Sequence, residues 1–194
     1  MLILAASAAG VAQRPVWADG VAQRPVWADG VAQRPVRAEP LHGVDNLTLL
    51  VPAEALPELS VQGADGAARR LAEFAGRGVL LNLWATWCAP CVAEMPALDA
   101  LAARLAGVAS PITVLPVAMD RGGAAVVRAF YDSHHLTHLP VWLDPEGDAL
   151  TAFKLRGIPT TFLLDAKGLA RARWEGPIDW SGADVPERLA RLLA

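Results

Sequence analysis

A nearly continuous apolar stretch at residues 79–84 is the strongest secondary-structure signal in the chain. A half-exposed strand would alternate apolar and polar residues, so this run predicts a strand that is buried on both faces. Apolar residues then recur at spacings of three and four, which gathers them on one face of a helix. The residues of this stripe are Val92, Met95, Leu98, Leu101 and Leu105. We therefore predict a buried strand that leads, after a short turn, into an amphipathic helix ending near Gly107.

Weaker patterns predict the remaining elements. Alternation over residues 59–63, followed by an Ala-Asp-Gly turn, predicts a small hairpin, and residues 67–76 are compatible with a helix. Pro116 lacks an amide hydrogen, so we expect a bulge or a strand end at that position. A turn at residues 165–168 indicates that the strands on either side of it are antiparallel. The expected strands are residues 112–119, 141–143, 160–164 and 170–174, and the expected helices are residues 124–134 and 186–193.

The first residues of the chain resemble the core of a secretory signal peptide. Residues 1–12 are apolar and too few to span a bilayer, and small residues at Val16 and Ala18 fit a cleavage site. We therefore predict a signal peptide at residues 1–18. No Lys or Arg precedes the apolar core, so the alternatives are a true start further upstream or a plain apolar tail.

A ten-residue repeat follows: residues 21–30 copy residues 11–20 without change, and residues 31–40 are a third copy. Solenoid units normally have about 20 residues or more and carry an element that can pack. These copies are shorter and contain Pro and Gly, so we expect residues 11–40 to be disordered. Residues 41–55 are then a lead-in segment, and residues 56–194 have the size of one compact domain.

Charge and histidine content exclude two function classes. The formal net charge is −3 and the positive residues form no basic stripe, which argues against a nucleic-acid surface. His134 and His138 have metal-ligand spacing for a helix, but their segment leads into Pro140 and looks like a helix C-terminus, where His interacts favourably with the helix dipole. We therefore predict no metal site.

The only two cysteines of the chain, Cys88 and Cys91, lie between the predicted buried strand and the helix. Unpaired amides and the dipole at a helix N-terminus favour negative charge, which lowers the pKa of the first thiol below the usual value of about 8.5. We expect Cys88 to be an exposed thiolate that attacks a partner's disulfide, and Cys91 to resolve the mixed disulfide. Pro90 stiffens the turn at a helix position where its missing amide costs nothing.

Two other interpretations of the cysteine pair are weaker. Half of a zinc site would need a second pair of ligands, and the chain has no further cysteine. A purely structural disulfide across so short a loop would constrain the unfolded chain very little. The strand–turn–helix context instead favours redox chemistry.

Three blocks of sequence, in order, resemble the TlpA/ResA group of thioredoxin-like thiol-disulfide reductases. They are residues 84–91 with Glu94 and Pro96, residues 157–165, and residues 175–180. The resemblance covers residues 56–194. It implies an α/β, thioredoxin-like fold, with a central mixed sheet flanked by helices and an N-terminal hairpin extension.

The same resemblance implies a role for Glu94. Thioredoxins carry a buried Asp at the position of Asn82, which cannot titrate, so Glu94 is the expected substitute proton carrier beside Cys91. The alternative is a solvated helix residue, which is the usual place of a glutamate.

The remaining candidate residues concern client binding. The resemblance implies a cis peptide bond between Ile158 and Pro159 that faces the cysteines and, with Thr160, keeps an extended edge open to a client backbone. Trp87 and Pro90 flank Cys88 and are expected to shape the docking surface. For Trp87 the alternative is simple packing.

These features together indicate a periplasmic protein-disulfide reductase that needs no cofactor beyond the Cys88–Cys91 disulfide. The resemblance implies client proteins with disulfides or paired cysteines, in cytochrome c maturation or copper-oxidase assembly. It also implies a membrane thiol carrier of the CcdA/DsbD type as electron donor. We expect a monomer.

Two rival functions come from other classes. A peroxiredoxin has the same fold but needs a Thr three residues before its reactive cysteine, where this chain has Ala85. A copper-binding assembly factor of the Sco type spaces its cysteines CxxxC and adds a distant His, whereas the spacing here is CxxC. Peroxide consumption and copper titration would separate these rivals from a disulfide reductase.

Overall fold

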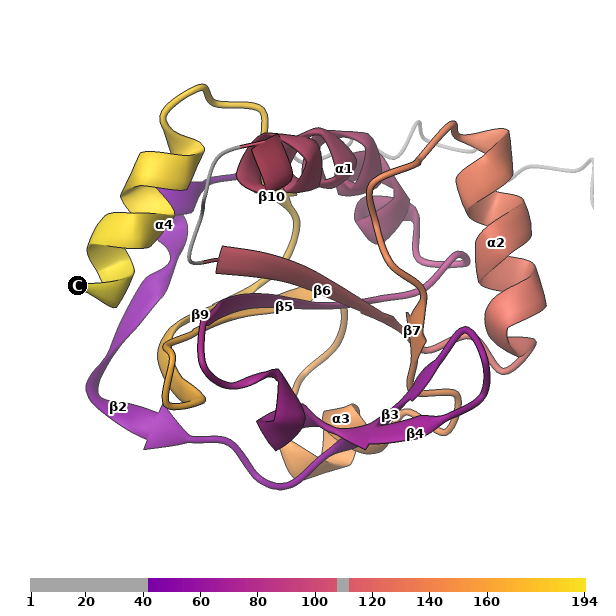
Figure 1. Ribbon diagram of the computed structural model, residues 1–194, viewed down its shortest axis with the longest axis horizontal. Helices are drawn as coiled ribbons and strands as arrows, with labels where there is room; N and C mark the ends of the chain where they lie inside the picture. The colour runs from indigo at the N-terminus through magenta and orange to yellow at the C-terminus, as the bar shows by residue number, and fades with distance from the viewer. Residues whose placement is uncertain (1–41, 108–111) are drawn as a thin grey trace, which may run out of the picture. The chain divides into compact units, whose positions relative to one another are not determined.

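The computed structural model describes residues 42–107 and 112–194, so the predicted signal peptide and repeat lie outside the described residues. An eight-stranded sheet in the order β2-β9-β8-β5-β6-β7-β3-β4 forms its centre (Figure 1). Its strands are β2 (Thr48–Ala55), β3 (Ser60–Gly63), β4 (Ala68–Arg70), β5 (Gly78–Trp84), β6 (Ile112–Ala118), β7 (Trp142–Leu143), β8 (Thr160–Leu164) and β9 (Leu169–Glu175). A separate parallel pair joins β1 (His42–Gly43) to β10 (Ile178–Asp179).

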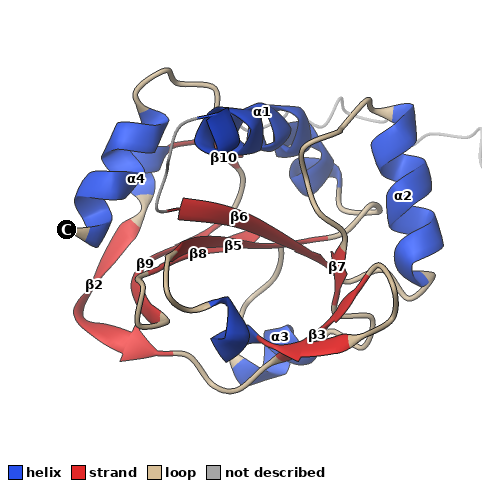
Figure 2. Ribbon diagram, viewed as in Figure 1, coloured by secondary structure: helices blue, strands red, loops and turns tan. Residues whose placement is uncertain are grey.

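Helices cover both faces of the sheet (Figure 2). Residues from α1 (Ala89–Gly107), α2 (Gly123–Ser133) and α4 (Val185–Leu193) pack on one face. Residues from α3 (Asp148–Ala152) and the short 3-10 helix η2 (Leu71–Phe74) pack on the other. A further 3-10 turn, η1 (Val44–Asn46), lies near the start of the described chain. Among the described residues, no helix is both long and apolar enough to cross a membrane.

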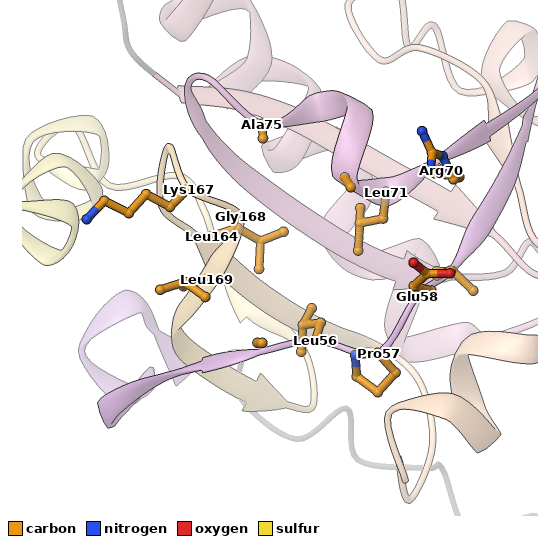
Figure 3. A pocket seen from close by; sticks show the side chains of 13 residues that line it. Leu56, Pro57, Glu58, Arg70, Leu71, Ala75, Leu164, Lys167, Gly168 and Leu169 are labelled. Atoms are coloured by element: carbon orange, nitrogen blue, oxygen red, sulfur yellow. The ribbon is translucent and has the colours of Figure 1, made fainter.

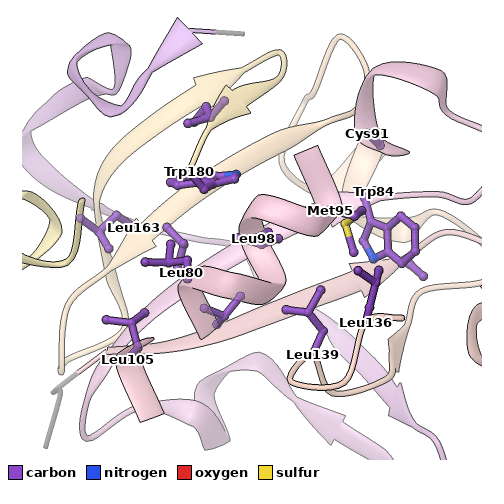
Figure 4. Packing of buried hydrophobic residues seen from close by; sticks show 14 of the residues in the cluster. Leu80, Trp84, Cys91, Met95, Leu98, Leu105, Leu136, Leu139, Leu163 and Trp180 are labelled. Atoms are coloured by element: carbon purple, nitrogen blue, oxygen red, sulfur yellow. The ribbon is translucent and has the colours of Figure 1, made fainter. Parts of the chain in front are cut away.

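Strand β5 divides the core into two layers. All of its residues are buried, as the apolar run predicts, and alternate side chains enter opposite layers. Leu80 and Trp84 belong to the layer under α1, together with Met95 and Leu98 of that helix (Figure 4). Burial of each such side chain contributes roughly 1.5–3 kcal/mol, so this layer fixes α1 on the sheet.

The strand pairing agrees with the elements predicted around β5. It is parallel to β6 and antiparallel to β8, and β8 pairs antiparallel with β9. The hairpin predicted after residue 59 is also present, as β3 and β4. A strand–helix–strand unit followed by an antiparallel pair in a mixed, helix-covered sheet is the thioredoxin-like arrangement that the sequence resemblance implies.

Two local predictions were wrong. Residues 67–76 do not form an α-helix, because Ala68–Arg70 pairs with β3 and leaves only the 3-10 turn Leu71–Phe74. Pro116 causes no bulge: it pairs with Asn82 in unbroken register. On its other side, β7 pairs with β6 only at Val117 and Ala118, so the sheet requires no amide from Pro116 there.

The two edges of the sheet differ in sequence and regularity. Strand β2 lies within the 41–55 segment, so the sheet includes residues expected only to lead into the domain. Its pairing with β9 shifts register between Leu49 and Glu54. At the other edge, β4 has three residues, all exposed, and ends in Arg69 and Arg70.

Candidate active site

The turn between β5 and α1 places the two cysteines at the start of the helix. Thr86 braces this turn: its amide and hydroxyl donate hydrogen bonds of 3.0 and 2.5 Å to the buried carboxylate of Asp120. Cys88 then precedes α1, and Cys91 lies in its first turn. The two residues form a disulfide, with Cα atoms 5.2 Å apart.

The two sulfur atoms have different surroundings. Cys91 is fully buried, and Cys88 is 7% exposed, which is less than the exposed thiolate we expected. Cys88 is covered because its Sγ lies 3.6 Å from the carbonyl oxygen of Ile158, on a neighbouring loop. The amide of Cys91 points at Cys88 Sγ from 3.3 Å, so a negative charge on a reduced Cys88 would meet an amide donor at the helix start.

The loop at Ile158 faces Cys88, and its peptide bond to Pro159 is cis, as the resemblance implies. Most of this loop is already engaged within the protein. Thr160 is fully buried and its hydroxyl donates to the carbonyl of Gly157 at 2.7 Å. The Pro159 carbonyl accepts the amide of Gly176 at 2.8 Å.

Of the three residues proposed for docking on this loop, only the half-buried Ile158 can offer atoms to a client; Pro159 and Thr160 are buried. Their role is to hold the loop in place, which corrects the expectation for Thr160. On the other side of Cys88, Trp87 is 68% exposed and Pro90 is also exposed. Trp87 is therefore not a packing residue, and with Pro90 and Ile158 it borders Cys88, the more exposed of the two cysteines.

Glu94 lies on α1, three residues after Cys91, and is fully buried. Its carboxylate accepts a 2.8 Å hydrogen bond from Asn82 Nδ2 and a 2.7 Å hydrogen bond from the amide of Ile178. Burial raises the pKa of Glu94 to about 7, against the opposing effect of these two donors. The Trp180 indole also acts to lower this pKa, although its N–H makes no hydrogen bond of normal geometry in the described chain. Glu94 is thus not the solvated helix residue of the alternative interpretation.

Sequence reasoning missed one member of this group, Thr161. Its Oγ1 accepts a hydrogen bond of 3.1 Å from the same Asn82 amide, across the β5–β8 pairing. Both residues are fully buried. The available signal was the position of Thr161 two residues after Pro159, in a strand that had to pair beside residues 79–84.

The histidines with metal-ligand spacing make other contacts in the structure. His138 Nδ1 and Asp99 Oδ2 lie at hydrogen-bond distance, 2.9 Å. Asp99 also accepts hydrogen bonds from the backbone amides of His138 and Leu139. His134 instead contacts the carbonyl of Phe130. Within residues 42–107 and 112–194, no three His, Cys, Asp or Glu side chains gather as metal ligands would.

A separate hollow of about 310 Å³ lies far along the sheet from the cysteines (Figure 3). It is lined by Leu56, Leu71 and Leu164, with Arg70 and Lys167 among the polar side chains. Leu164 pairs with Val79 near the start of β5, whereas the cysteines follow the end of that strand. This hollow therefore takes no part in the chemistry of the disulfide.

Comparisons with known proteins agree with this site. The AhpC/TSA family profile matches residues 52–173. The thioredoxin-like protein YneN of Bacillus subtilis is 35% identical over 58% of this chain, and the thiol-disulfide oxidoreductase ResA of Oceanobacillus iheyensis is 36% identical over 54%. The matches span 65% and 52% of the length of these two relatives.

The fold is shared with solved structures. A secreted thiol-disulfide isomerase from Corynebacterium glutamicum superimposes with a TM-score of 0.63 at 24% identity, over 79% of this chain and 96% of that one. StoA from Bacillus subtilis gives a TM-score of 0.55 at 24% identity, over 72% and 99%. These likenesses establish the thioredoxin-like fold.

Proposed function

Because this chain belongs to the AhpC/TSA family, with relatives named thiol-disulfide oxidoreductases, we propose that it reduces disulfides of client proteins through Cys88 and Cys91. The observation that carries this proposal is the disulfide at the start of α1, in which Cys88 is partly accessible and Cys91 is fully buried, with the buried carboxyl of Glu94 three residues further along the helix. A disulfide with a purely structural role would need neither the different solvent exposure of its two cysteines nor the buried carboxyl of Glu94.

The reaction is a two-electron exchange of disulfides. In the reduced protein, the Cys88 thiolate attacks one sulfur of the client disulfide; a Cys88–client bond forms, the client S–S bond breaks, and the second client sulfur leaves as a thiolate. Cys91 then loses its proton and attacks Cys88 Sγ. The Cys88–Cys91 bond forms, the mixed disulfide breaks, and the client is released with both sulfurs reduced.

Glu94 accepts the proton that Cys91 loses in the second step. Cys91 is fully buried and cannot exchange its proton directly with bulk water. A carboxyl with a pKa of about 7, one helical turn along α1, can accept that proton near neutral pH. As an anion it also opposes thiolate formation at Cys91, which keeps the resolving thiol protonated until the mixed disulfide has formed.

The setting of the reaction is part of the proposal. An exported reductase must be recharged with electrons from across the membrane, since disulfides persist outside the cytoplasm. A membrane thiol carrier of the CcdA/DsbD type would supply them, and cytochrome c or copper-oxidase assembly proteins with paired cysteines would be the clients. The apolar start of the chain supports export to the periplasm, where we propose that the protein acts as a monomer.

The test is insulin reduction by wild type and single-cysteine variants. Cys88→Ser removes the attacking sulfur, so turnover should fall to the uncatalysed background. Cys91→Ser keeps the attack but lacks the resolving thiol, so it should accumulate a mixed disulfide that non-reducing electrophoresis detects. If both variants reduced insulin as fast as wild type, the proposal would be wrong.

A peroxide assay serves as the control for the peroxidase alternative. Ala85 stands where a peroxiredoxin needs a threonine hydroxyl, so wild type should consume hydrogen peroxide no faster than an ordinary thiol. Rapid peroxide consumption that depends on Cys88 would assign the pair to peroxide chemistry instead.

A further inference from the structure

Three polar side chains form a cluster inside the apolar layer under α1. They are Asn82 on β5, Glu94 on α1 and Thr161 on β8, and all three are fully buried. Asn82 Nδ2 donates both of its hydrogens, one to Glu94 Oε1 at 2.8 Å and one to Thr161 Oγ1 at 3.1 Å. The amide group of Asn82 is thus the link between the carboxyl and the hydroxyl.

One buried polar atom of this cluster is unsatisfied. Asn82 Oδ1 has no hydrogen-bond partner in the described part of the chain. A buried acceptor without a hydrogen-bond partner lowers the stability of the folded state. If residue 82 only filled space, an apolar side chain of similar size would avoid this cost. The asparagine therefore has a role that an apolar residue could not perform.

The protonation of Glu94 has a defined geometry. Oε2 accepts the Ile178 amide at 2.7 Å, so a proton on the carboxyl goes to Oε1, the oxygen that faces Asn82. With the amide in its present orientation, that O–H would meet the N–H group of Asn82, donor against donor. The arrangement suits the carboxylate and not the acid.

The other groups around Glu94 cannot compensate. The groups found to act on Glu94 are Asn82 from β5, the Ile178 amide of β10 and the indole of Trp180, and the buried Cys91 lies three residues earlier on its own helix. None of these is a charged side chain, and Cys91 does not titrate while the disulfide is closed. Only Asn82 can change from donor to acceptor.

We propose that Asn82 and Thr161 are positioning residues that adapt to both protonation states of Glu94 by rotation of the Asn82 amide. Beside the carboxylate, Nδ2 occupies the shared position and donates to Glu94 and Thr161. Beside the protonated acid, Oδ1 occupies the same position and accepts from both, because the Thr161 hydroxyl rotates to become a donor. Two lone pairs on Oδ1 match the two hydrogens on Nδ2, so the shared position is satisfied in either state.

This inference deepens the proposed function, because it assigns to β5 and β8 the control of the proton that Glu94 is proposed to carry. Thr161 matters because its hydroxyl can act as donor or acceptor. A valine of similar shape would leave one N–H of Asn82 without an acceptor beside the carboxylate, but would cost the acid form less, since Oδ1 would still accept from Glu94. Loss of the hydroxyl should therefore favour the acid.

The experiment is an NMR titration of the oxidised protein with ¹³C-labelled glutamate carboxyls. In this form the cysteines do not titrate, so the Glu94 midpoint is not coupled to a thiol. Thr161→Val should raise the midpoint of Glu94 by roughly 0.5–1 pH unit, the size expected for one buried hydrogen bond. Thr161→Ser keeps the hydroxyl and should titrate like wild type.

Thr160→Val is the matched control, because Thr160 is the adjacent buried threonine and its hydroxyl bonds Gly157 instead of Asn82. It should leave the Glu94 midpoint unchanged. In wild type, the Asn82 side-chain amide signals should shift with the same midpoint as Glu94.

Two results would overturn the inference: a Thr161→Val titration that superimposes on wild type in a folded protein, or Asn82 amide signals that do not respond to the Glu94 titration. Neither result depends on turnover. A failure of this inference can therefore be distinguished from a failure of the proposed reductase activity, because the cysteine variants test that activity separately.

Discussion

At the scale of single residues, we expect the buried carboxyl of Glu94 to affect how the reduced cysteines respond to pH. Its pKa is raised to about 7 by burial, so it titrates in the range in which a reactive thiol also ionises. The carboxyl and the thiols of the reduced protein will therefore titrate as a coupled group, whose measured pKa values belong to the cluster.

Replacement of this carboxyl gives a direct prediction. In reduced Glu94→Gln, the alkylation rate of Cys88 should lose the step in its pH profile near 7 while the protein stays folded, because the amide fills the same space without titrating. The measurement is iodoacetamide reaction between pH 5 and 10, with Glu187→Gln, at an exposed position of α4, as the matched control. Superimposable profiles for wild type and Glu94→Gln would remove Glu94 from the mechanism.

The residues of the site were predictable to different degrees. Cys88 and Cys91 follow from their spacing at a strand–helix junction, because that spacing is local in sequence, whereas Glu94 was implied only by the family resemblance. Thr161 and the low exposure of Cys88 depend on which strand and which loop pack beside the cysteines. These contacts join residues 79 and 70 positions apart, and no periodic pattern in one sequence encodes such a pairing.

At the scale of elements, Arg104 of α1 binds the segment of residues 178–182 that leads to α4. Its guanidinium donates to the carbonyls of Gly182 and Trp180, both at 2.8 Å. The same segment carries the Ile178 amide that binds Glu94. A side chain on the last turn of α1 thus helps to place a donor at the helix start.

Arg104→Met should lower the free energy of unfolding by about 1.5–3 kcal/mol, because two carbonyls lose a charged donor while the apolar stem is kept. Chemical denaturation of the oxidised protein measures this loss. Arg191→Met, on the exposed side of α4, is the control and should change stability by less than about 0.5 kcal/mol. Equal effects of the two substitutions would contradict a specific role for Arg104.

Elements with a strong internal pattern were predictable, and those decided by pairing were not. Strand β5 has a nearly continuous apolar run, and helix α1 has an apolar stripe with spacings of three and four, so each pattern indicates one type of element. Residues 67–76 have a composition that is compatible with a helix. However, Ala68–Arg70 pairs with β3 as the second strand of the hairpin, and the residues that remain are too few for an α-helix. Tertiary pairing overrides a weak local preference there.

At the scale of the whole molecule, Glu94 makes stability depend on pH. Its pKa is 4.5 in the unfolded reference and about 7 when folded, so the folded state binds more protons between these values. Stability should therefore be highest below pH 4.5 with respect to this group and should fall as pH rises to about 7, by roughly 3 kcal/mol.

Denaturant unfolding of the oxidised protein at intervals from pH 4.5 to 7.5 checks this prediction. Glu94→Gln should lack this decline, because glutamine does not ionise. The difference between the two proteins removes the contributions of all other titrating groups. A difference that stays constant over this pH range would mean that Glu94 does not carry the raised pKa.

The two edges of the sheet have a consequence for self-association. Exposed edge strands are templates on which another chain can add, and they lead to aggregation unless they are interrupted or charged. Edge strand β2 has a break in register and contains Pro52 and Glu54, although Val51 beside them is 87% exposed. The opposite edge strand, β4, has only three residues, and two of them are exposed arginines. Neither edge of the described sheet offers a long, regular row of free backbone groups. If the protein reduces client disulfides as proposed, it can bind partly unfolded clients at Cys88 without adding their strands to its sheet.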